Sequence, residues 1–400
     1  MAIPVFKEEH LTQAETLEHP HKRKNLSIGI LKETVPLENR VALVPASVAY
    51  LVGNNHKVVV EMGAGTKSHF TDHEYGEAGA DIVYSKEEVF KCDVILKVAP
   101  PTLDEINYFH PNQILISPLQ IPLISSDYIN KLRQKRVIAL AMEYMKDDDG
   151  SFPLVRILSE LAGISAILTA ADLLTATSGG TGVLLGGISG VPPAKVVILG
   201  GGVVAEYATR TAMGLGAGVY VFDNNIYKLM RLQARVGQRL YTSSINPTYL
   251  MNALQDADVA IGAVHSKAGR TQLIVSEEMV SKMKPGSVII DVSIDQGGCF
   301  ETSEVTTLEN PTFEKYGVIH YCVPNIASKV PRTASIAISN IITPILAKAG
   351  SAGSIENVLF SHINLRNGVY TYKGCLTNLY LSTRFGIKYT DLDLLITSTF

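Results

Sequence analysis

The sequence predicts an α/β protein built from two Rossmann-like, doubly wound domains. Short apolar segments alternate with helix-like segments, one long apolar helix interrupts this alternation, and a glycine turn opens a second alternating series. The chain has 400 residues, of which 46% are hydrophobic. Because single cores rarely grow beyond about 250 residues, two cores are expected.

The first alternating series begins at residue 26. Its six strand-like segments are short, apolar and bounded by turn residues or polar stretches. They are "LSIGILKET", "VVVEMGAG", "ADIVY", "DVILKVAP", "QILISPL" and "VIALAMEY". Helices that connect parallel strands produce this alternation, so these segments are expected to form one parallel sheet.

A long apolar segment then breaks the alternation. Residues 153–175, "PLVRILSELAGISAILTAADLLT", are periodic, begin with a proline and are expected to form one helix that links the two domains. The charge-free tract at 173–194 is longer than the usual span of about 20 residues. Its glycines and prolines argue against a membrane helix and favour a loop, so no membrane partner is expected.

A second alternating series follows this loop. Its strand-like segments are "AKVVILGGG", "GVYVFD", "DVAIGAV", "SVIIDVS" and "GVIHYCVP", which predict a second doubly wound unit. From residue 333, "TASIAISNIITPILAKAG" predicts a helix, and the tail after it has no strong strand signals. The pattern alone does not assign this last segment to either domain.

Charge and cysteine content exclude several classes of function. Lys and Arg together number 35 and Asp and Glu 38, and no long basic run occurs, so no nucleic-acid partner is expected and a small molecule is favoured. The four cysteines form no CxxC pair, which argues against a disulfide framework or zinc cluster and fits a reducing cytoplasm. They are Cys92, Cys299, Cys322 and Cys375. The first 25 residues are polar and are not expected to be a targeting signal.

The glycine turn at residues 200–205 predicts a nucleotide site. Gly200, Gly202 and Ala205 match G-x-G-x-x-G/A between a strand and a helix, so backbone amides approach a pyrophosphate that the helix N-terminus stabilises. Asp223 closes the next strand, where its carboxylate accepts hydrogen bonds from an adenosine ribose and repels a 2′-phosphate. NAD is therefore expected as the cofactor in preference to NADP. The alternative is a glycine cluster that serves packing only.

Two basic residues follow strands of the first series. Arg40, in the loop after the first strand, has a planar guanidinium that binds a carboxylate bidentately; the alternative is a solvated surface arginine. Lys97 ends an apolar strand, where a lysine is expected only if its ammonium meets a ligand or a carboxylate.

An acidic pair follows a strand of the second series. Asp295 precedes two glycines, a setting suited to a carboxylate that orients or activates a nucleophile beside a nicotinamide. Asp291 competes for this role, and the pattern leaves the choice open. His69 and His73 have the spacing of a metal pair, but Thr71 and the residue after it resemble a helix cap, so no metal site is expected.

Seven blocks of the sequence together resemble the alanine dehydrogenase family, which is similar in fold to the NAD-binding part of pyridine nucleotide transhydrogenase. The blocks are "GILKETVPLENRVALVP", "EMGAGTKSHFTDHEYGEAGA", "VILKVAPP", "PLVRILSELAG", "GVLLGGISGVPPAKVVILGGG", "VIIDVSIDQGGCFETSEVTT" and "HYCVPNIASKVPRTAS". The resemblance covers roughly residues 26–395 in order and is far more specific than the glycine turn alone.

The resemblance implies a discontinuous domain arrangement and a reaction. Residues 1–153 and 332–400 would form the substrate domain, and residues 154–331 would form an NAD-binding domain inserted between them. The family interconverts L-alanine and pyruvate plus ammonia with NAD. Its members are homo-oligomers, commonly hexamers, so this chain is expected to assemble with copies of itself.

The resemblance also implies roles for individual residues. Arg40 would bind the substrate carboxylate, Lys97 would contact its carboxylate or carbonyl during catalysis, and Asp295 would be the catalytic acid. Five further positions match the family at or near the cofactor: Ser159, Gly202, Asp223, Lys228 and Asn325.

One substitution departs from the family pattern. Gln120 stands where the family has a catalytic histidine, and glutamine does not exchange a proton near neutral pH. The segment "KVAPP" also lacks a glutamate that the family usually has. Lys97 and Asp295 could still stabilise charge while Gln120 orients the substrate. Two alternatives stay open: a different amino or 2-oxo acid, given Pro118 and Pro122 beside Gln120, or an NAD(H)-binding protein without its own substrate.

Overall fold

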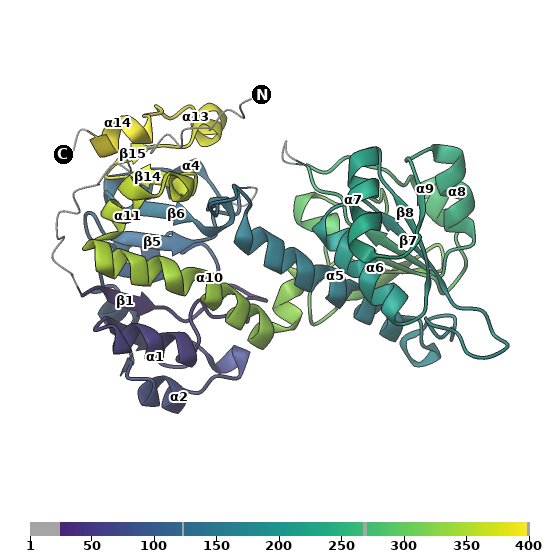
Figure 1. The fold of residues 1–400 in the computed structure, drawn as a ribbon, viewed down its shortest axis with the longest axis horizontal. Helices are drawn as coiled ribbons and strands as arrows, with labels where there is room; N and C mark the ends of the chain where they lie inside the picture. Colours follow the sequence, from purple (N-terminus) through teal and green to yellow (C-terminus); the bar gives the residue numbers. More distant parts are fainter. Residues whose placement is uncertain (1–24, 122–123, 267–269, 398–400) are drawn as a thin grey trace, which may run out of the picture.

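The computed structural model describes residues 25–121, 124–266 and 270–397. The prediction for the N-terminal extension therefore falls almost entirely outside the described residues, as does Pro122. Two sheets organise the described chain, and each lies in its own lobe (Figure 1). The first sheet has the order β15-β14-β6-β5-β4-β1-β2-β3, and the second has the order β12-β13-β11-β10-β7-β8-β9.

The strands of the first sheet are β1 (Ser27–Ile30), β2 (Lys57–Glu61), β3 (Asp81–Val83), β4 (Val94–Leu96), β5 (Ile114–Ser117), β6 (Ile138–Ala141), β14 (Val369–Tyr372) and β15 (Cys375–Leu376). Those of the second are β7 (Lys195–Leu199), β8 (Gly218–Phe222), β9 (Tyr241–Ser243), β10 (Val259–Gly262), β11 (Val288–Asp291), β12 (Thr312–Lys315) and β13 (Val318–Tyr321). All pairs are parallel except those that involve β12, β14 and β15.

The first lobe consists of the first sheet with α1 (Pro45–Gly53), α2 (Asp72–Glu77), α3 (Lys86–Val89), α4 (Ser126–Gln134), α11 (Ile355–Ser361), α12 (Ile363–Arg366), α13 (Leu379–Phe385) and α14 (Leu392–Thr397). The second lobe consists of the second sheet with α6 (Val203–Gly214), α7 (Ile226–Val236), α8 (Pro247–Gln255) and α9 (Glu277–Ser281). Two long helices, α5 (Pro153–Leu173) and α10 (Pro331–Ala352), run between the lobes (Figure 1).

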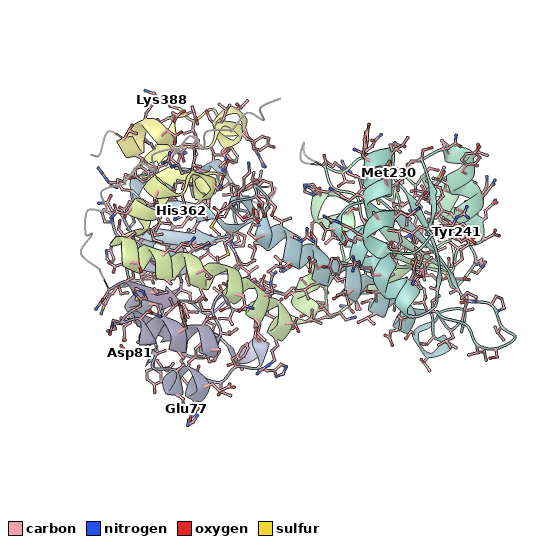
Figure 2. The ribbon with its side chains drawn as sticks, in the orientation of Figure 1. Glu77, Asp81, Met230, Tyr241, His362 and Lys388 are labelled. Atoms are coloured by element: carbon pink, nitrogen blue, oxygen red, sulfur yellow. The ribbon has the colours of Figure 1, made fainter. Side chains whose placement is uncertain are left out.

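Each sheet has an apolar cluster on both faces, as a doubly wound sheet requires. In the first lobe, α1 and α10 pack on one face and α4 on the other, and the side chains of β4 alternate between the two clusters. Figure 2 labels His362 and Lys388 on this lobe and Met230 and Tyr241 on the second. The prediction of two doubly wound α/β domains is confirmed.

All eleven strand-like segments of the sequence form strands, and the helix predicted at 153–175 is α5. The sequence pattern does not predict β9, β12, β14 and β15. The segments of β9 (YTS) and β12 (TFEK) are rich in polar residues, and β15 has only two residues. In the tail, where the sequence has no strong strand signals, the structure has the short strands β14 and β15. Lys373 and Gly374, both with positive φ, form the tight turn that joins β14 to β15.

The strand order determines where ligands can bind. The parallel strands of both sheets follow the doubly wound order, with the switch between β1 and β4 in the first and between β7 and β10 in the second. Ligands of such sheets bind in the crevice beyond the carboxyl ends of the strands at this switch. The chain also returns to the first sheet through β14 after completing the second. The exact domain boundaries stay predictions.

Helix α5 packs closely on the second lobe. A Cβ placed on Gly163 would lie 2.4 Å from the carbonyl oxygen of Val204 in α6, so only glycine allows this approach. Among the described helices, α5 alone has the length and apolar composition of a membrane span. Ala162, Ala166 and Ala170 are buried, as in the core helix of a globular domain.

Candidate active site

The first candidate residue, Arg40, lies in the loop after β1 and is buried. Its Nε and Nη2 donate to the two carboxylate oxygens of Glu38 at 2.7 and 2.6 Å. The alternative of a solvated surface arginine is therefore wrong, because only 4% of Arg40 is exposed. An arginine in this geometry presents a fixed guanidinium plane, which is the form suited to carboxylate recognition.

Lys97 follows β4 and is completely buried. Its ammonium lies 3.2 Å from Oε2 of Glu33 and 3.4 Å from Oε1 of Glu105. Burial raises the pKa of Glu33, and the nearby Lys97 opposes this shift. Of the two environments expected for this lysine, a ligand or a carboxylate, the structure contains the carboxylates.

The structure distinguishes the two aspartates that follow β11. Asp291 is buried and accepts hydrogen bonds from the backbone N–H groups of Ser293, Cys299 and Phe300 and from the Ser303 hydroxyl. It therefore organises the turn after the strand.

Asp295, in the short 3₁₀ helix η5 (Val292–Gln296), is exposed to solvent and accepts one bond, from the backbone N–H of Asn325 at 2.9 Å. Surrounding protein atoms raise the pKa of Asp295, while the Asn325 bond and the charge of Arg40 lower it.

Gln120 lies in the loop after β5 with a left-handed backbone, φ 49°. Its backbone N–H and that of Leu119 donate to Oε1 of Glu143, at 3.1 and 2.8 Å. Glu143 follows β6, and burial raises the pKa of its carboxyl. Lys97, Gln120 and Glu143 thus follow three neighbouring strands at the same edge of the first sheet.

The glycine turn lies at the switch point of the second sheet. Gly200 has φ 113°, and a Cβ there would lie 2.4 Å from the Ala263 carbonyl oxygen after β10. Gly202 begins α6, where no side chain in the described structure caps the helix and a Cβ would meet nothing within 4 Å. Ala205 is buried in α6. The turn therefore leaves an open helix N-terminus, which favours an anion.

Asp223 directly follows β8, beside this turn, and is 8% exposed. Its Oδ2 accepts from the Gly201 N–H and its Oδ1 from the Asn225 N–H, both at 2.7 Å. Lys228 of α7 lies 3.6 Å from Oδ2. A carboxylate has about four acceptor positions, so two remain for a ribose. His265, which sequence reasoning missed, follows β10, and burial and Lys228 lower its pKa.

The remaining cofactor candidates lie between the lobes. Ser159 is half-buried on α5. Asn325 has a left-handed backbone, begins the 3₁₀ helix η6 (Ile326–Lys329) and donates from Nδ2 to Oε2 of Glu38 at 3.1 Å. The structure therefore brings Arg40, Asp295 and Asn325 together through Glu38.

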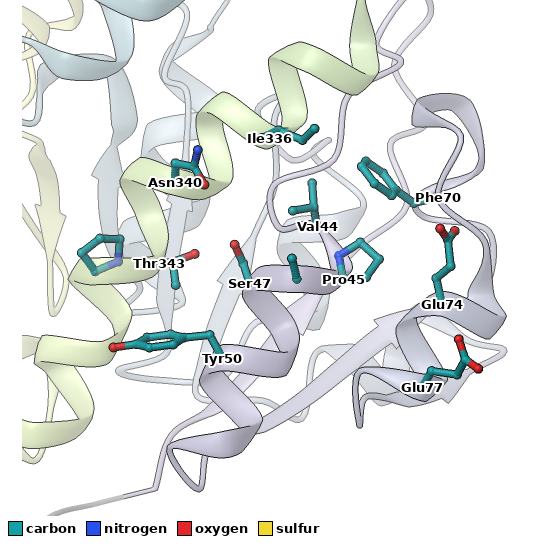
Figure 3. A pocket seen from close by; sticks show the side chains of 12 residues that line it. Val44, Pro45, Ser47, Tyr50, Phe70, Glu74, Glu77, Ile336, Asn340 and Thr343 are labelled. Atoms are coloured by element: carbon teal, nitrogen blue, oxygen red, sulfur yellow. The ribbon is translucent and has the colours of Figure 1, made fainter.

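Other features of the fold do not contribute to this site. Thr71 caps α2 through a reciprocal pair of hydrogen bonds with Glu74, so the expected helix cap is confirmed. Within the described parts of the chain, no three His, Cys, Asp or Glu side chains cluster as metal ligands. A hollow of about 800 Å³ opens between α1, α2 and α10, lined by Tyr50 and Phe70 (Figure 3), but no candidate residue lines it.

Two family models match nearly the whole chain. The alanine dehydrogenase/PNT N-terminal domain matches residues 29–162, and the alanine dehydrogenase/PNT C-terminal domain matches residues 166–379. This chain belongs to the alanine dehydrogenase/PNT family. Alanine dehydrogenases of Staphylococcus haemolyticus and Bacillus subtilis are each 39% identical to it, with 92% of this chain covered and 98% and 96% of theirs.

Solved structures of the alanine dehydrogenase/PNT family have the same fold. An L-alanine dehydrogenase superposes with a TM-score of 0.85 at 36% identity, covering 90% of this chain and 99% of that one. A transhydrogenase from Sinorhizobium meliloti superposes with a TM-score of 0.75 at 25% identity, covering 88% of this chain and 99% of that one. The similarity therefore extends over both lobes of the alanine dehydrogenase/PNT fold.

The carboxylates around the candidate site were missed by sequence reasoning. Glu33, Glu38, Glu105 and Glu143 are acids in loops after strands or at their ends, and each contacts a candidate residue or its backbone. The available signal was position, since Glu33 lies shortly after the end of β1 and Glu143 shortly after the end of β6. Their pairing with particular partners depends on packing.

Proposed function

We propose that the protein is an NAD-dependent alanine dehydrogenase that converts L-alanine, NAD and water into pyruvate, ammonium and NADH. The observation that carries the proposal is the hydrogen-bonded chain that joins Arg40 to Asp295 through Glu38 and Asn325, in a protein with the fold of an L-alanine dehydrogenase. Lys97 follows β4 at the switch point of the first sheet. The charge of Arg40 acts on Asp295, so these two residues belong to one electrostatic environment.

The second lobe is proposed to bind the cofactor, which accepts a hydride from the substrate α-carbon when bound. The fit rests on the open N-terminus of α6 at Gly202 and on the glycine backbone at Gly200, where a side chain would collide with Ala263. The remaining acceptor positions of Asp223 would bind the adenosine ribose. Ser159, Lys228 and Asn325 are proposed to contact the cofactor.

The first lobe is proposed to bind the amino or 2-oxo acid. Arg40 would bind the substrate carboxylate, and Lys97 would stabilise negative charge on the carboxylate or carbonyl oxygen. Asp295 would take a proton from the attacking water during alanine oxidation and return it in the reverse direction. Gln120 would orient the substrate, since its amide both donates and accepts hydrogen bonds.

The decisive experiment follows NADH absorbance with purified protein, ammonium and a panel of 2-oxoacids that includes pyruvate and glyoxylate. Turnover with pyruvate supports the proposal. Turnover with a different 2-oxoacid and not with pyruvate would assign the enzyme a different substrate. NADH binding without turnover on any member would contradict the proposal and favour a nucleotide-binding protein, the alternative raised by the missing histidine.

Gln120→His is expected to raise turnover, by at most about 10²–10⁴-fold, because an imidazole adds an acid/base group near neutral pH. Histidine tolerates a left-handed backbone such as the φ of 49° at this position. The gain should follow an imidazole pKa in the rate profile. Gln120→Asn is the matched control, and an equal response of both variants would contradict a role in proton exchange.

Two glycine variants are expected to separate folding from cofactor binding. Gly200→Ala should destabilise the fold by about 1–3 kcal/mol, because it introduces both strain at positive φ and a collision. Gly202→Ala should leave the melting temperature unchanged, yet weaken NADH binding at least about tenfold (~1.4 kcal/mol) by filling the ligand space. NADH fluorescence titration and thermal melting measure the two effects. Unchanged NADH affinity in Gly202→Ala would place the cofactor elsewhere.

We further propose that the protein acts in the cytoplasm as a homo-oligomer, with a hexamer as the expected form. The family resemblance supports the assembly, and the widely spaced cysteines without a CxxC pair support a reducing compartment. Light scattering of the purified chain measures the assembly directly.

A further inference from the structure

Glu38 contacts both lobes at the candidate site. It is 3% exposed, and its two oxygens accept from Nε and Nη2 of Arg40. Its Oε1 also accepts from the Arg40 backbone N–H at 3.0 Å. On the other side, Nδ2 of Asn325 donates to Oε2 at 3.1 Å. Because Asn325 follows β13 and Arg40 follows β1, this carboxylate joins the ends of the two sheets.

The contact continues to the proposed catalytic aspartate. The backbone N–H of Asn325 donates to Oδ1 of Asp295 at 2.9 Å. A continuous chain of hydrogen bonds therefore runs from the Arg40 guanidinium through Glu38 and Asn325 to Asp295. A change in the position of Glu38 therefore affects Arg40, the proposed substrate-binding residue. It also affects Asn325, which donates to Asp295, the proposed proton acceptor.

The geometry of the pair also selects one edge of the guanidinium. Glu38 occupies the edge formed by Nε and Nη2, so a second carboxylate can pair bidentately only with the edge that includes Nη1. Among the described residues, Nη1 makes no hydrogen bond. The orientation of Arg40 that Glu38 stabilises is thus the one that leaves this edge to the substrate.

The backbone on both sides of Glu38 is bonded to the same segment of the second lobe. Ser328 Oγ donates to the Leu37 carbonyl at 2.6 Å and accepts from the Asn39 N–H at 3.1 Å. Leu37 and Asn325 both have left-handed backbones, at φ 67° and 56°. These bonds fix the backbone of the loop, whereas the Glu38 side chain alone reaches Arg40.

We propose that Glu38 is a positioning residue that couples substrate binding at Arg40 to the Asn325–Asp295 pair of the other lobe. The inference rests on the proposed function, because it assigns Arg40 to the substrate carboxylate. Loss of the Glu38 charge releases Arg40 to other orientations and removes an acceptor from Asn325. Both KM for the 2-oxoacid and kcat should then change, while the cofactor turn around Gly200 is unaffected.

The test is a double-mutant cycle of Glu38→Gln and Asn325→Gly, measured as kcat/KM for pyruvate and as stability in urea. Glycine at 325 retains the left-handed backbone and removes only the side chain. Glu38→Gln should raise KM for pyruvate tenfold or more, and Glu38→Asp should recover part of the loss. The double variant should be at least fivefold better than the product of the two single effects.

The control is Ser328→Ala, which removes hydrogen bonds to the same loop without touching the Glu38 carboxylate. It should change KM for pyruvate less than twofold. If single effects multiply independently, or if Ser328→Ala matches Glu38→Gln, the coupling is refuted while the proposed function stands. If the wild type does not turn over pyruvate, the proposed function fails, and the urea cycle still decides whether Glu38 and Asn325 are coupled.

Discussion

Lys97→Ala is expected to abolish measurable turnover and to lower the free energy of unfolding by about 3–5 kcal/mol. The stability loss arises because the variant leaves the carboxylates of Glu33 and Glu105 buried without their cation. The loss of activity is expected because no ammonium remains at this position to stabilise negative charge on the substrate. Among the described residues, no other cation pairs with Glu33 or Glu105. Urea denaturation and NADH absorbance measure the two effects.

Two further variants distinguish the structural role of Lys97 from its catalytic role. Lys57→Ala removes an exposed lysine that also pairs with a carboxylate, Asp81, and should change stability little. The double variant Lys97→Met with Glu33→Gln removes opposite charges together, so it should recover stability but not turnover. Normal turnover in that double variant would show that Lys97 has a purely structural role.

Asp295→Asn is expected to lower kcat about 10²–10⁴-fold with unchanged NADH affinity, because an amide does not accept a proton. Desolvation by surrounding protein atoms raises the pKa of Asp295 above its ordinary value. Alanine oxidation needs the ionised form, so its rate should fall as the pH decreases through this raised pKa. The fall should be absent from the residual activity of the Asn variant.

Asp291→Asn is the matched control for this prediction. An amide there would face backbone N–H groups that now donate to the carboxylate, and the free energy of unfolding should decrease by about 1–3 kcal/mol. The affinity for NADH and the acidic fall in rate should be retained in the fraction that folds. If Asp291→Asn removed that fall and Asp295→Asn did not, the proposed roles of the two aspartates would be reversed.

Features formed by consecutive residues could be predicted from the sequence. The apolar strands after residues 26 and 194 and the turn at Gly200 are local patterns, and they predicted both sheets and the nucleotide crevice. The strand β14 was not accessible. It is buried along all four residues, but a threonine interrupts the apolar run of its segment VYTY.

The candidate site was predictable as a set of residues and not as a set of contacts. Sequence pattern identified Arg40, Lys97 and Asp295 because charged groups at strand ends are unusual enough to suggest function. It left Asp291 and Asp295 equivalent, since both follow the same strand. Only the folded turn shows that Asp291 accepts five hydrogen bonds internally while Asp295 remains exposed.

The sequence by itself determined the two-domain α/β architecture, the glycine turn and the membership of the alanine dehydrogenase/PNT family. These depend on periodicity, turn chemistry and residue order, which are encoded in adjacent residues. The tertiary structure alone decided that Lys97 lies between two carboxylates and that Glu38 meets Asn325, 287 residues away along the chain. Such pairs form only when separate sheets and loops pack together, and no local pattern specifies that packing.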